Sequence, residues 1–144
     1  MTAFLLLPAS EHDKDFIFEA FKTTMREYVE WAWGWNEGFQ RDGFWANLPV
    51  QKFKLICVGG QNAGALYVEE SAQNHCVRTL FLRPEFQGHG VGSAVLTQEV
   101  VRATAAKKFL VLKVIKINPA KRLYDRMGFK VVQEDEATFH MQWG

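Results

Sequence analysis

The sequence predicts an α+β fold in which a mixed, mostly antiparallel sheet of about seven strands is flanked by about four helices. Three observations predict it: a run of short strands in the middle of the chain, a glycine-rich loop between a strand and a helix, and a nearly unbroken apolar run over residues 109–117. Such a run is typical of a central strand covered on both faces. We expect the elements in the order β-α-α-β-β-β-α-β-α-β-β, within one domain spanning residues 1–144.

The first part of the chain is expected to hold one strand, two helices and a three-stranded meander. Residues 4–7 form an apolar strand before Pro8, and residues 15–31 repeat apolar side chains at helical spacing. A shorter helix is expected over residues 36–46, before Pro49. The meander is expected over residues 54–59, 64–70 and 75–82, with the turn sequence Gly-Gly-Gln-Asn after its first strand.

The second part is expected to alternate helices and strands. Asn118 is expected to cap a short helix, and Gly128 to end it in a left-handed conformation with Phe129 folded back on its last turn. The remaining elements are a helix over residues 91–107, the strand over 109–117, and a final hairpin over 131–133 and 138–143.

Composition excludes several functional classes. Seventeen basic and sixteen acidic residues give a formal charge of +1, so no net field attracts nucleic acid or an anionic membrane. No apolar run approaches the length of a membrane span. Cys57 and Cys76 are isolated and are expected as small core residues in a reducing compartment, and the histidines lack metal-ligand spacing. We expect a cytoplasmic protein without a metal, nucleic-acid or membrane partner.

The segment from Leu80 to Ser93, LFLRPEFQGHGVGS, places three alternating glycines between a strand and a helix. The first amides of a helix lack internal partners and carry the positive end of its dipole, so the segment predicts a phosphate or pyrophosphate site. The P-loop string G-x-x-x-x-G-K-S/T is absent from the chain. A dinucleotide fingerprint read from Gly88 is disfavoured, because its third glycine is Ser93 and the next strand carries Lys113 and Lys116 instead of a carboxylate.

The string Gln87-x-x-Gly90-x-Gly92 resembles the acyl-CoA loop of the GCN5-related N-acetyltransferase (GNAT) family, Gln/Arg-x-x-Gly-x-Gly/Ala. Arg83-Pro84 precedes it, where that family commonly has such a dipeptide. Residues 118–129, NPAKRLYDRMGF, resemble the family's second motif, N…LY…GF, although six positions instead of the frequent seven separate Asn from Tyr. The resemblance covers residues 54–129, and the order of elements is similar to that of the GNAT fold.

The resemblance implies an N-acetyltransferase that uses acetyl-CoA as acyl donor and transfers the acetyl group to a primary amine by direct attack in a ternary complex. It implies a strand splayed from its neighbour, whose free backbone groups pair with the pantetheine arm. Tyr124 is the expected catalytic acid, because a phenol stays protonated at neutral pH and can donate to the leaving thiolate. The expected cofactor-binding residues are Leu80, Phe81, Leu82, Gln87, Gly88, His89, Gly90, Val91, Gly92, Ser93 and Asn118.

The acceptor is expected to be a small-molecule or peptide amine. In the family, the region around residues 31–41 helps to shape the acceptor pocket. Trp33 and Trp35 with Glu37 suit a cationic amine, whereas Arg41 suits an acceptor that carries a carboxylate. Alternatively, the indoles hold the connection between two helices on the core.

Three questions stay open at this level: the general base, the oligomeric state and the length of the donor's acyl group. Several side chains on or beside strands are candidate bases: Glu69, Glu70, His75, Glu136 and His140. The alternative function is a non-catalytic CoA-binding regulatory module on the same fold.

Overall fold

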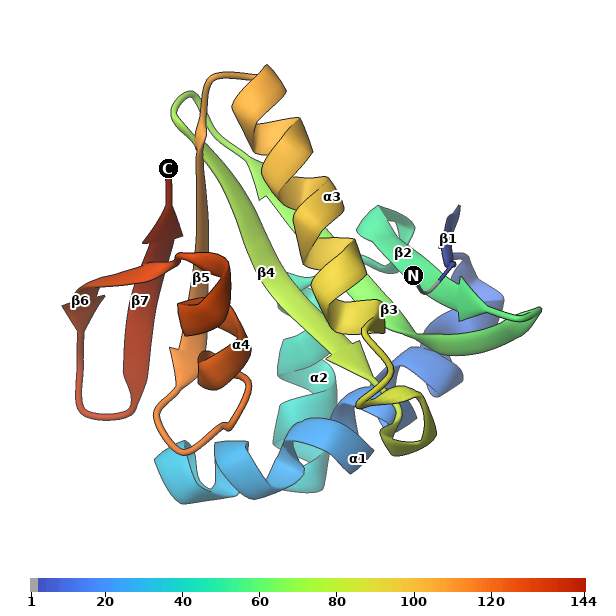
Figure 1. The fold of residues 1–144 in the computed structure, drawn as a ribbon. Helices are drawn as coiled ribbons and strands as arrows, with labels where there is room; N and C mark the ends of the chain where they lie inside the picture. The colour runs from blue at the N-terminus through green and yellow to red at the C-terminus, as the bar shows by residue number, and fades with distance from the viewer. Residues whose placement is uncertain (1–2) are drawn as a thin grey trace.

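The computed structural model describes residues 3–144, which leaves the first two residues of the expected domain outside the described part. Among the described residues, seven strands form one sheet in the order β1-β2-β3-β4-β5-β7-β6 (Figure 1). The strands are β1 (Leu5–Pro8), β2 (Phe53–Val58), β3 (Gln61–Glu70), β4 (Asn74–Leu82), β5 (Phe109–Ile115), β6 (Lys130–Glu134) and β7 (Thr138–Trp143). The α-helices are α1 (Lys14–Trp33), α2 (Glu37–Asn47), α3 (Val91–Ala105) and α4 (Lys121–Met127). Only β4 and β5 pair in parallel, so the predicted α+β fold class is confirmed.

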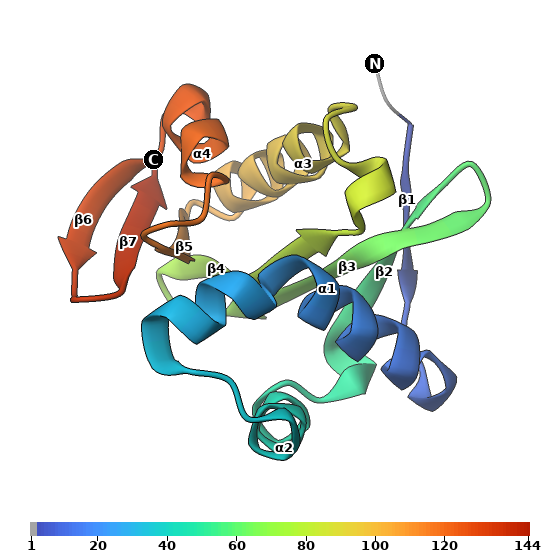
Figure 2. The ribbon, with the colours of Figure 1, turned by 90° about the horizontal axis from the view of Figure 1, so that it is seen from below.

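The helices lie on both faces of the sheet. Helices α1 and α2 cover one face, and α3 and α4 cover the other (Figure 2). Each face buries its own apolar cluster, which accounts for the strongly apolar strands in the middle of the sheet. The α1 side buries Ile17, Phe18, Phe44, Phe53 and Tyr67, and the α3 side buries Val95, Leu96, Leu110, Leu112 and Met141.

The sequence located the elements well but placed one helix start wrongly. Helix α4 begins at Lys121, not next to Asn118, whose side-chain oxygen instead accepts the Ala120 N–H at 2.9 Å in a turn before the helix. The predicted helix end is confirmed: Gly128 is left-handed at φ 99°, and the Phe129 N–H donates to the Tyr124 carbonyl at 3.0 Å.

The sheet forks between its two parallel strands. The register of β4 and β5 ends at Val77 opposite Leu112; beyond this point β5 pairs with β7 only, and β4 pairs with β3 only as far as Leu82. At the fork β4 also bulges: Tyr67 pairs with Thr79 and Val68 with Val77, so that Arg78 is the extra residue. The expected splay is therefore present.

Gly64 of β3 lies so close to its partner strand β4, where it pairs with Leu82, that no side chain fits. A Cβ at this position would lie 1.9 Å from the Phe81 carbonyl oxygen and 2.9 Å from Leu82 Cα. We expect Gly64→Ala to lower the free energy of unfolding, measured by denaturant titration, by about 3 kcal/mol, because backbone atoms cannot rotate away.

Gly43→Ala is the matched control for this substitution. Gly43 lies inside α2, and its added Cβ would meet no heavy atom within 4 Å. This variant is expected to gain about 0.5–1 kcal/mol, since alanine is the better helix former. A Gly64→Ala protein as stable as wild type would contradict the close approach of β3 and β4.

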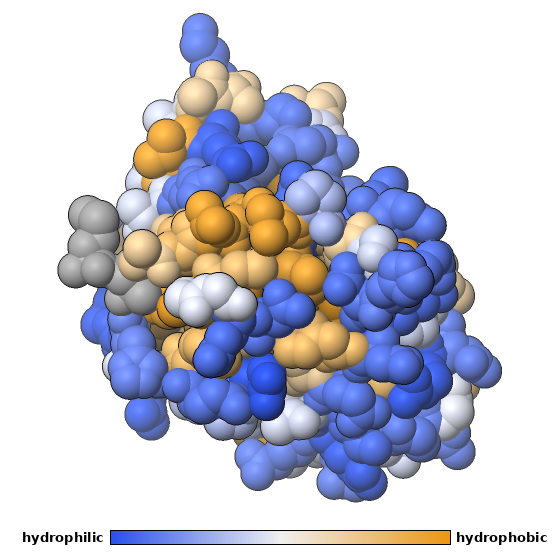
Figure 3. All heavy atoms as spheres, turned by 90° about the vertical axis from the view of Figure 1, so that its right-hand side faces the viewer, coloured by the Kyte–Doolittle hydropathy of each residue, from blue (hydrophilic) through white to orange (hydrophobic). Residues whose placement is uncertain are grey.

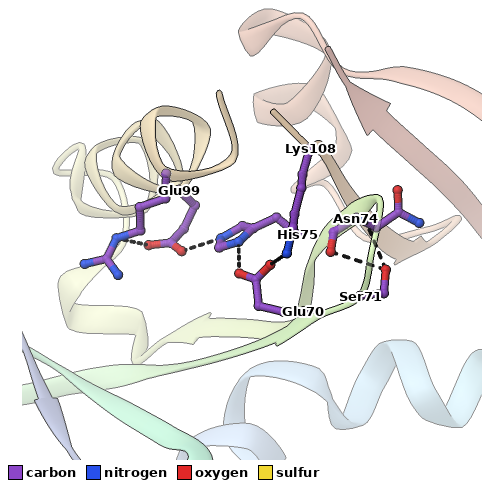
Figure 4. Close-up of polar contacts among 7 residues, drawn as sticks. Glu70, Ser71, Asn74, His75, Glu99 and Lys108 are labelled. Carbon is purple, nitrogen blue, oxygen red and sulfur yellow. Dashed lines mark hydrogen bonds and ion pairs between the residues drawn. The ribbon is translucent and has the colours of Figure 1, made fainter. Parts of the chain in front are cut away.

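A buried polar cluster joins the paired start of β4 to α3 (Figure 4). His75 is 5% exposed; its Nε2 lies 2.8 Å from Glu99 Oε1, and its Nδ1 contacts the Glu70 carboxylate. Lys108 Nζ donates to Glu70 at 2.8 Å. Glu99 is 2% exposed, and its second oxygen has no hydrogen-bond partner within residues 3–144, although Arg102 Nε lies 3.6 Å away. Two of the candidate bases, Glu70 and His75, thus belong to this cluster.

The two edges of the sheet are formed by β1 and β6. Strand β7 lies between β5 and β6, so it offers no open edge to a neighbouring chain. Leu5 and Leu7 are exposed on β1, and Figure 3 shows an apolar area on the side of the molecule that carries this strand. Within residues 3–144, no helix is long and apolar enough to cross a membrane.

Candidate active site

A cavity of about 530 Å³ lies at the fork of the sheet, between β4, the start of α3 and α4. Ten of the eleven expected cofactor residues line it, and only His89, which is exposed, does not. The ten are Leu80, Phe81, Leu82, Gln87, Gly88, Gly90, Val91, Gly92, Ser93 and Asn118. Sequence reasoning missed Thr24, Met25 and Tyr28, which α1 brings to the same cavity from the other end of the chain.

The glycine loop directs the N-terminus of α3 toward this cavity. Gly88 and Gly90 are left-handed at φ 77° and 82°, a conformation that other residues adopt only with strain. Gly90 is the N-cap of α3, so the unpaired amides of the first turn follow it directly. Gln87 Nε2 donates to the Leu82 carbonyl at 2.8 Å, which fixes the loop to the end of β4.

The end of β4 that has no pairing with β5 presents backbone groups to the same cavity. The Arg83 N–H donates to the Ala63 carbonyl on the β3 side at 2.8 Å, which sets the phase of the antiparallel ladder. Because hydrogen-bonding direction alternates along a strand, the N–H and C=O groups of Leu80 and Leu82 face the gap left by β5. The Leu82 carbonyl already accepts the hydrogen bond from Gln87 Nε2, so the N–H and C=O of Leu80 are the backbone groups left to face a ligand.

Tyr124 on α4 is 9% exposed and lines the cavity. Its ring packs 5.8 Å from that of Phe129, centroid to centroid, and its hydroxyl has no hydrogen-bond partner within the described residues. Burial raises the pKa of Tyr124 to about 12. The hydroxyl is therefore a protonated donor throughout the neutral and moderately alkaline range.

A second cavity, of about 560 Å³, lies on the α1 and α2 side of the fork. It shares Met25, Leu80, Asn118 and Tyr124 with the first cavity, so the two meet at the tyrosine. Asp135 lies on its wall, and hydrogen bonds from the Thr138 hydroxyl and from the backbone of Thr138 and Ala137 lower the pKa of Asp135 to about 2.

Of the four expected acceptor residues, Trp33 lines the second cavity, whereas Trp35, Glu37 and Arg41 line neither cavity. The Trp35 Nε1–H donates to Glu37 at 3.0 Å, and Arg41 lies within ion-pair distance of the same carboxylate. Hydrogen bonds from Trp35 and Lys22 lower the pKa of Glu37. These three residues contact one another at the connection between α1 and α2.

None of the five candidate bases lines either cavity. Most residues of the second cavity were not expected from the sequence, among them Phe39, Arg78 and Lys113. Lys113 could have been recognised, because it is the single charged residue in the apolar sequence FLVLKVI of β5.

Comparison with known proteins agrees with this geometry. Residues 49–131, more than half of the chain, match the family model described as an acetyltransferase (GNAT) domain. No curated protein matches the chain. An acetyltransferase from Thermus thermophilus superposes with a TM-score of 0.77 at 18% identity, over 99% of both chains.

Two further solved structures show the same fold. The PaiA N-acetyltransferase from Thermoplasma acidophilum, solved in complex with coenzyme A, has a TM-score of 0.72 at 17% identity and covers 97% of this chain and 98% of its own. Ard1 from Thermoplasma volcanium has the same TM-score and identity, over 98% and 97%. The family match over most of the forked sheet and its glycine loop means that this protein belongs to the GNAT acetyltransferase family.

Proposed function

We propose that residues 1–144 form a single acetyl-CoA-dependent N-acetyltransferase domain that transfers the acetyl group to a primary amine by direct attack in a ternary complex. The observation that carries the proposal is the meeting of two cavities at Tyr124. One offers backbone amides and a free strand edge to a cofactor, and the other offers an apolar space to an acceptor.

The residues of the first cavity suit coenzyme A. The amides that follow Gly90 bind the pyrophosphate, as helix N-termini do. The free N–H and C=O of Leu80 pair with the amides of the pantetheine arm as an added strand does. The bound cofactor supplies the acetyl group and leaves as a thiolate. The complex of the PaiA relative with coenzyme A supports this assignment.

Tyr124 is the proton donor of the proposed reaction. The amine nitrogen forms its bond to the acetyl carbonyl carbon, the carbon–sulfur bond breaks, and the Tyr124 hydroxyl protonates the departing sulfur. The nitrogen releases its extra proton to solvent, and solvent returns a proton to the Tyr124 phenolate. Neither Cys57 nor Cys76 lines a cavity, which favours direct transfer over an acyl-enzyme.

Calorimetric titration with acetyl-CoA, followed by thiol release across a panel of amines, tests the proposal. Binding with turnover supports it; binding without turnover of any amine favours the non-catalytic CoA-binding module; absence of binding contradicts it. Gly90→Ala is expected to weaken acetyl-CoA binding, whereas Gly60→Ala is the matched control. Gly60 has nearly the same φ, 80° against 82°, but lies in the turn between β2 and β3, and it lines neither cavity.

A further inference from the structure

The lining of the second cavity is mostly apolar. Helix α1 contributes Phe21, Val29 and Trp33, and α2 contributes Phe39 and Phe44. Trp33 and Phe39 are 64% and 75% exposed, so the fold leaves two aromatic side chains uncovered at this cavity. A volume of about 560 Å³ is typical of small-molecule sites. An apolar body of the size of one aromatic ring with a short chain fits this space and buries these surfaces.

The wall of the second cavity carries two basic residues, Arg78 and Lys113, and one acidic residue, Asp135. Arg78 is paired with the Glu69 carboxylate at 3.2 Å. Asp135 accepts hydrogen bonds from the Ala137 N–H at 2.9 Å, from the Thr138 N–H at 2.7 Å and from the Thr138 hydroxyl at 2.8 Å. A polycationic acceptor would therefore find a single carboxylate on this wall, that of Asp135, whose oxygens already accept three hydrogen bonds.

Lys113 is the remaining charged residue of the cavity wall. It has no ion-pair partner within residues 3–144. It follows Leu112, the last residue of β5 that pairs with β4, and it lines the second cavity beside the fork. A lone ammonium beside an apolar cavity favours a ligand with a negatively charged group.

We propose that the acceptor is a small primary amine with an aromatic or similarly apolar body and a carboxylate, the body filling the second cavity and the carboxylate facing Lys113. The proposal rests on the N-acetyltransferase function proposed above. In this proposal, Trp33 and Phe39 contact the apolar body of the acceptor. Lys113 makes the site prefer amines that carry a carboxylate over amines that lack one.

The test compares kcat/KM, by thiol release at saturating acetyl-CoA, among matched amines. Phenethylamine has the body alone, and glycine has the carboxylate alone. Phenylalanine carries its carboxylate beside the amine, and 4-(2-aminoethyl)benzoate carries it across the ring. Spermidine is the polycation, and a tripeptide that begins with phenylalanine represents peptides. We expect the better carboxylated aromatic amine to exceed each of the other four classes by about tenfold or more.

Two variants test the role of the ammonium group. Lys113→Met is expected to reduce the ratio of kcat/KM between the better carboxylated amine and phenethylamine from about tenfold to near unity. Lys116→Met is the control, because Lys116 pairs with Glu134 at 3.1 Å and lines neither cavity; it should keep the ratio.

The outcomes separate the acceptor proposal from the function on which it rests. Turnover that is fastest with spermidine, glycine or the peptide would overturn the acceptor class and leave the acetyltransferase intact. Acetyl-CoA binding without turnover of any of these amines would also overturn the acceptor class. Failure to bind acetyl-CoA would overturn the proposed function itself.

Discussion

Replacing Tyr124 by Phe is expected to lower kcat by about 10²–10⁴-fold while the Kd for acetyl-CoA stays within about threefold of the wild-type value. The substitution removes only the hydroxyl, and the ring that packs on Phe129 remains. Because the hydroxyl has no hydrogen-bond partner within the described residues, its loss breaks no bond of the folded protein. The loss of activity therefore arises in the step in which the thiolate leaves. Steady-state kinetics measures kcat, and calorimetry measures the Kd for acetyl-CoA.

The pH dependence of this variant distinguishes proton donation from packing. Burial raises the pKa of Tyr124 to about 12, so the protonated, donating form extends upward in pH instead of being lost near 10. The ratio of wild-type to Tyr124→Phe kcat is thus expected to stay constant from about pH 7 to about pH 10. A ratio that collapses within this range would assign the proton to another group.

Tyr67→Phe provides the matched control. Tyr67 is a fully buried tyrosine in the core of the α1 side and lines neither cavity. The kcat of the Tyr67→Phe variant is expected to equal that of the wild-type protein. A Tyr124→Phe enzyme with wild-type kcat would remove the tyrosine from the mechanism.

The lining of the first cavity could be predicted because its geometry is local. Gly88 and Gly90 adopt left-handed conformations within one loop, and the helix that they introduce begins at the next residue. Tyr124 lies in the short helix α4 and Gly128 is its C-cap, so a short sequence motif is enough to place both residues. In both segments neighbours along the chain set the conformation, and the sequence alone carries that information.

The acceptor side could not be predicted in this way, because long-range register assembles it. Lys113 lies at the cavity because β5 leaves β4 one residue earlier, and Arg78 because β4 bulges at that position. Trp35 and Glu37 are sequence neighbours of Trp33, but the turn at Gly34 directs them toward the connection between α1 and α2. Periodicity shows which face of an element is apolar, not where two strands part.

The cluster around His75 was also invisible in the sequence, since its partner Glu99 is a carboxylate on the apolar face of α3. Replacing His75 by Leu is expected to lower the free energy of unfolding by about 3–5 kcal/mol, because Glu99 stays buried at 2% exposure without its partner. Each ring nitrogen of His75 lies within hydrogen-bond distance of a carboxylate, Nδ1 of Glu70 and Nε2 of Glu99, and leucine can contact neither in this way. Denaturant titration measures the loss.

A double-mutant cycle separates charge pairing from packing in this cluster. Glu99→Leu is the second single variant of the cycle; it leaves the buried His75 ring without this partner, and it should cost about 1–3 kcal/mol. The double variant His75→Leu/Glu99→Leu removes both partners, and it should recover most of the loss, since an apolar pair of similar volume replaces a buried ion pair at little cost. Costs that simply add would mean that the ring acts through its packing alone. Recovery would show that His75 and Glu99 are energetically coupled, and this pair joins α3 to the half of β4 that pairs with β5.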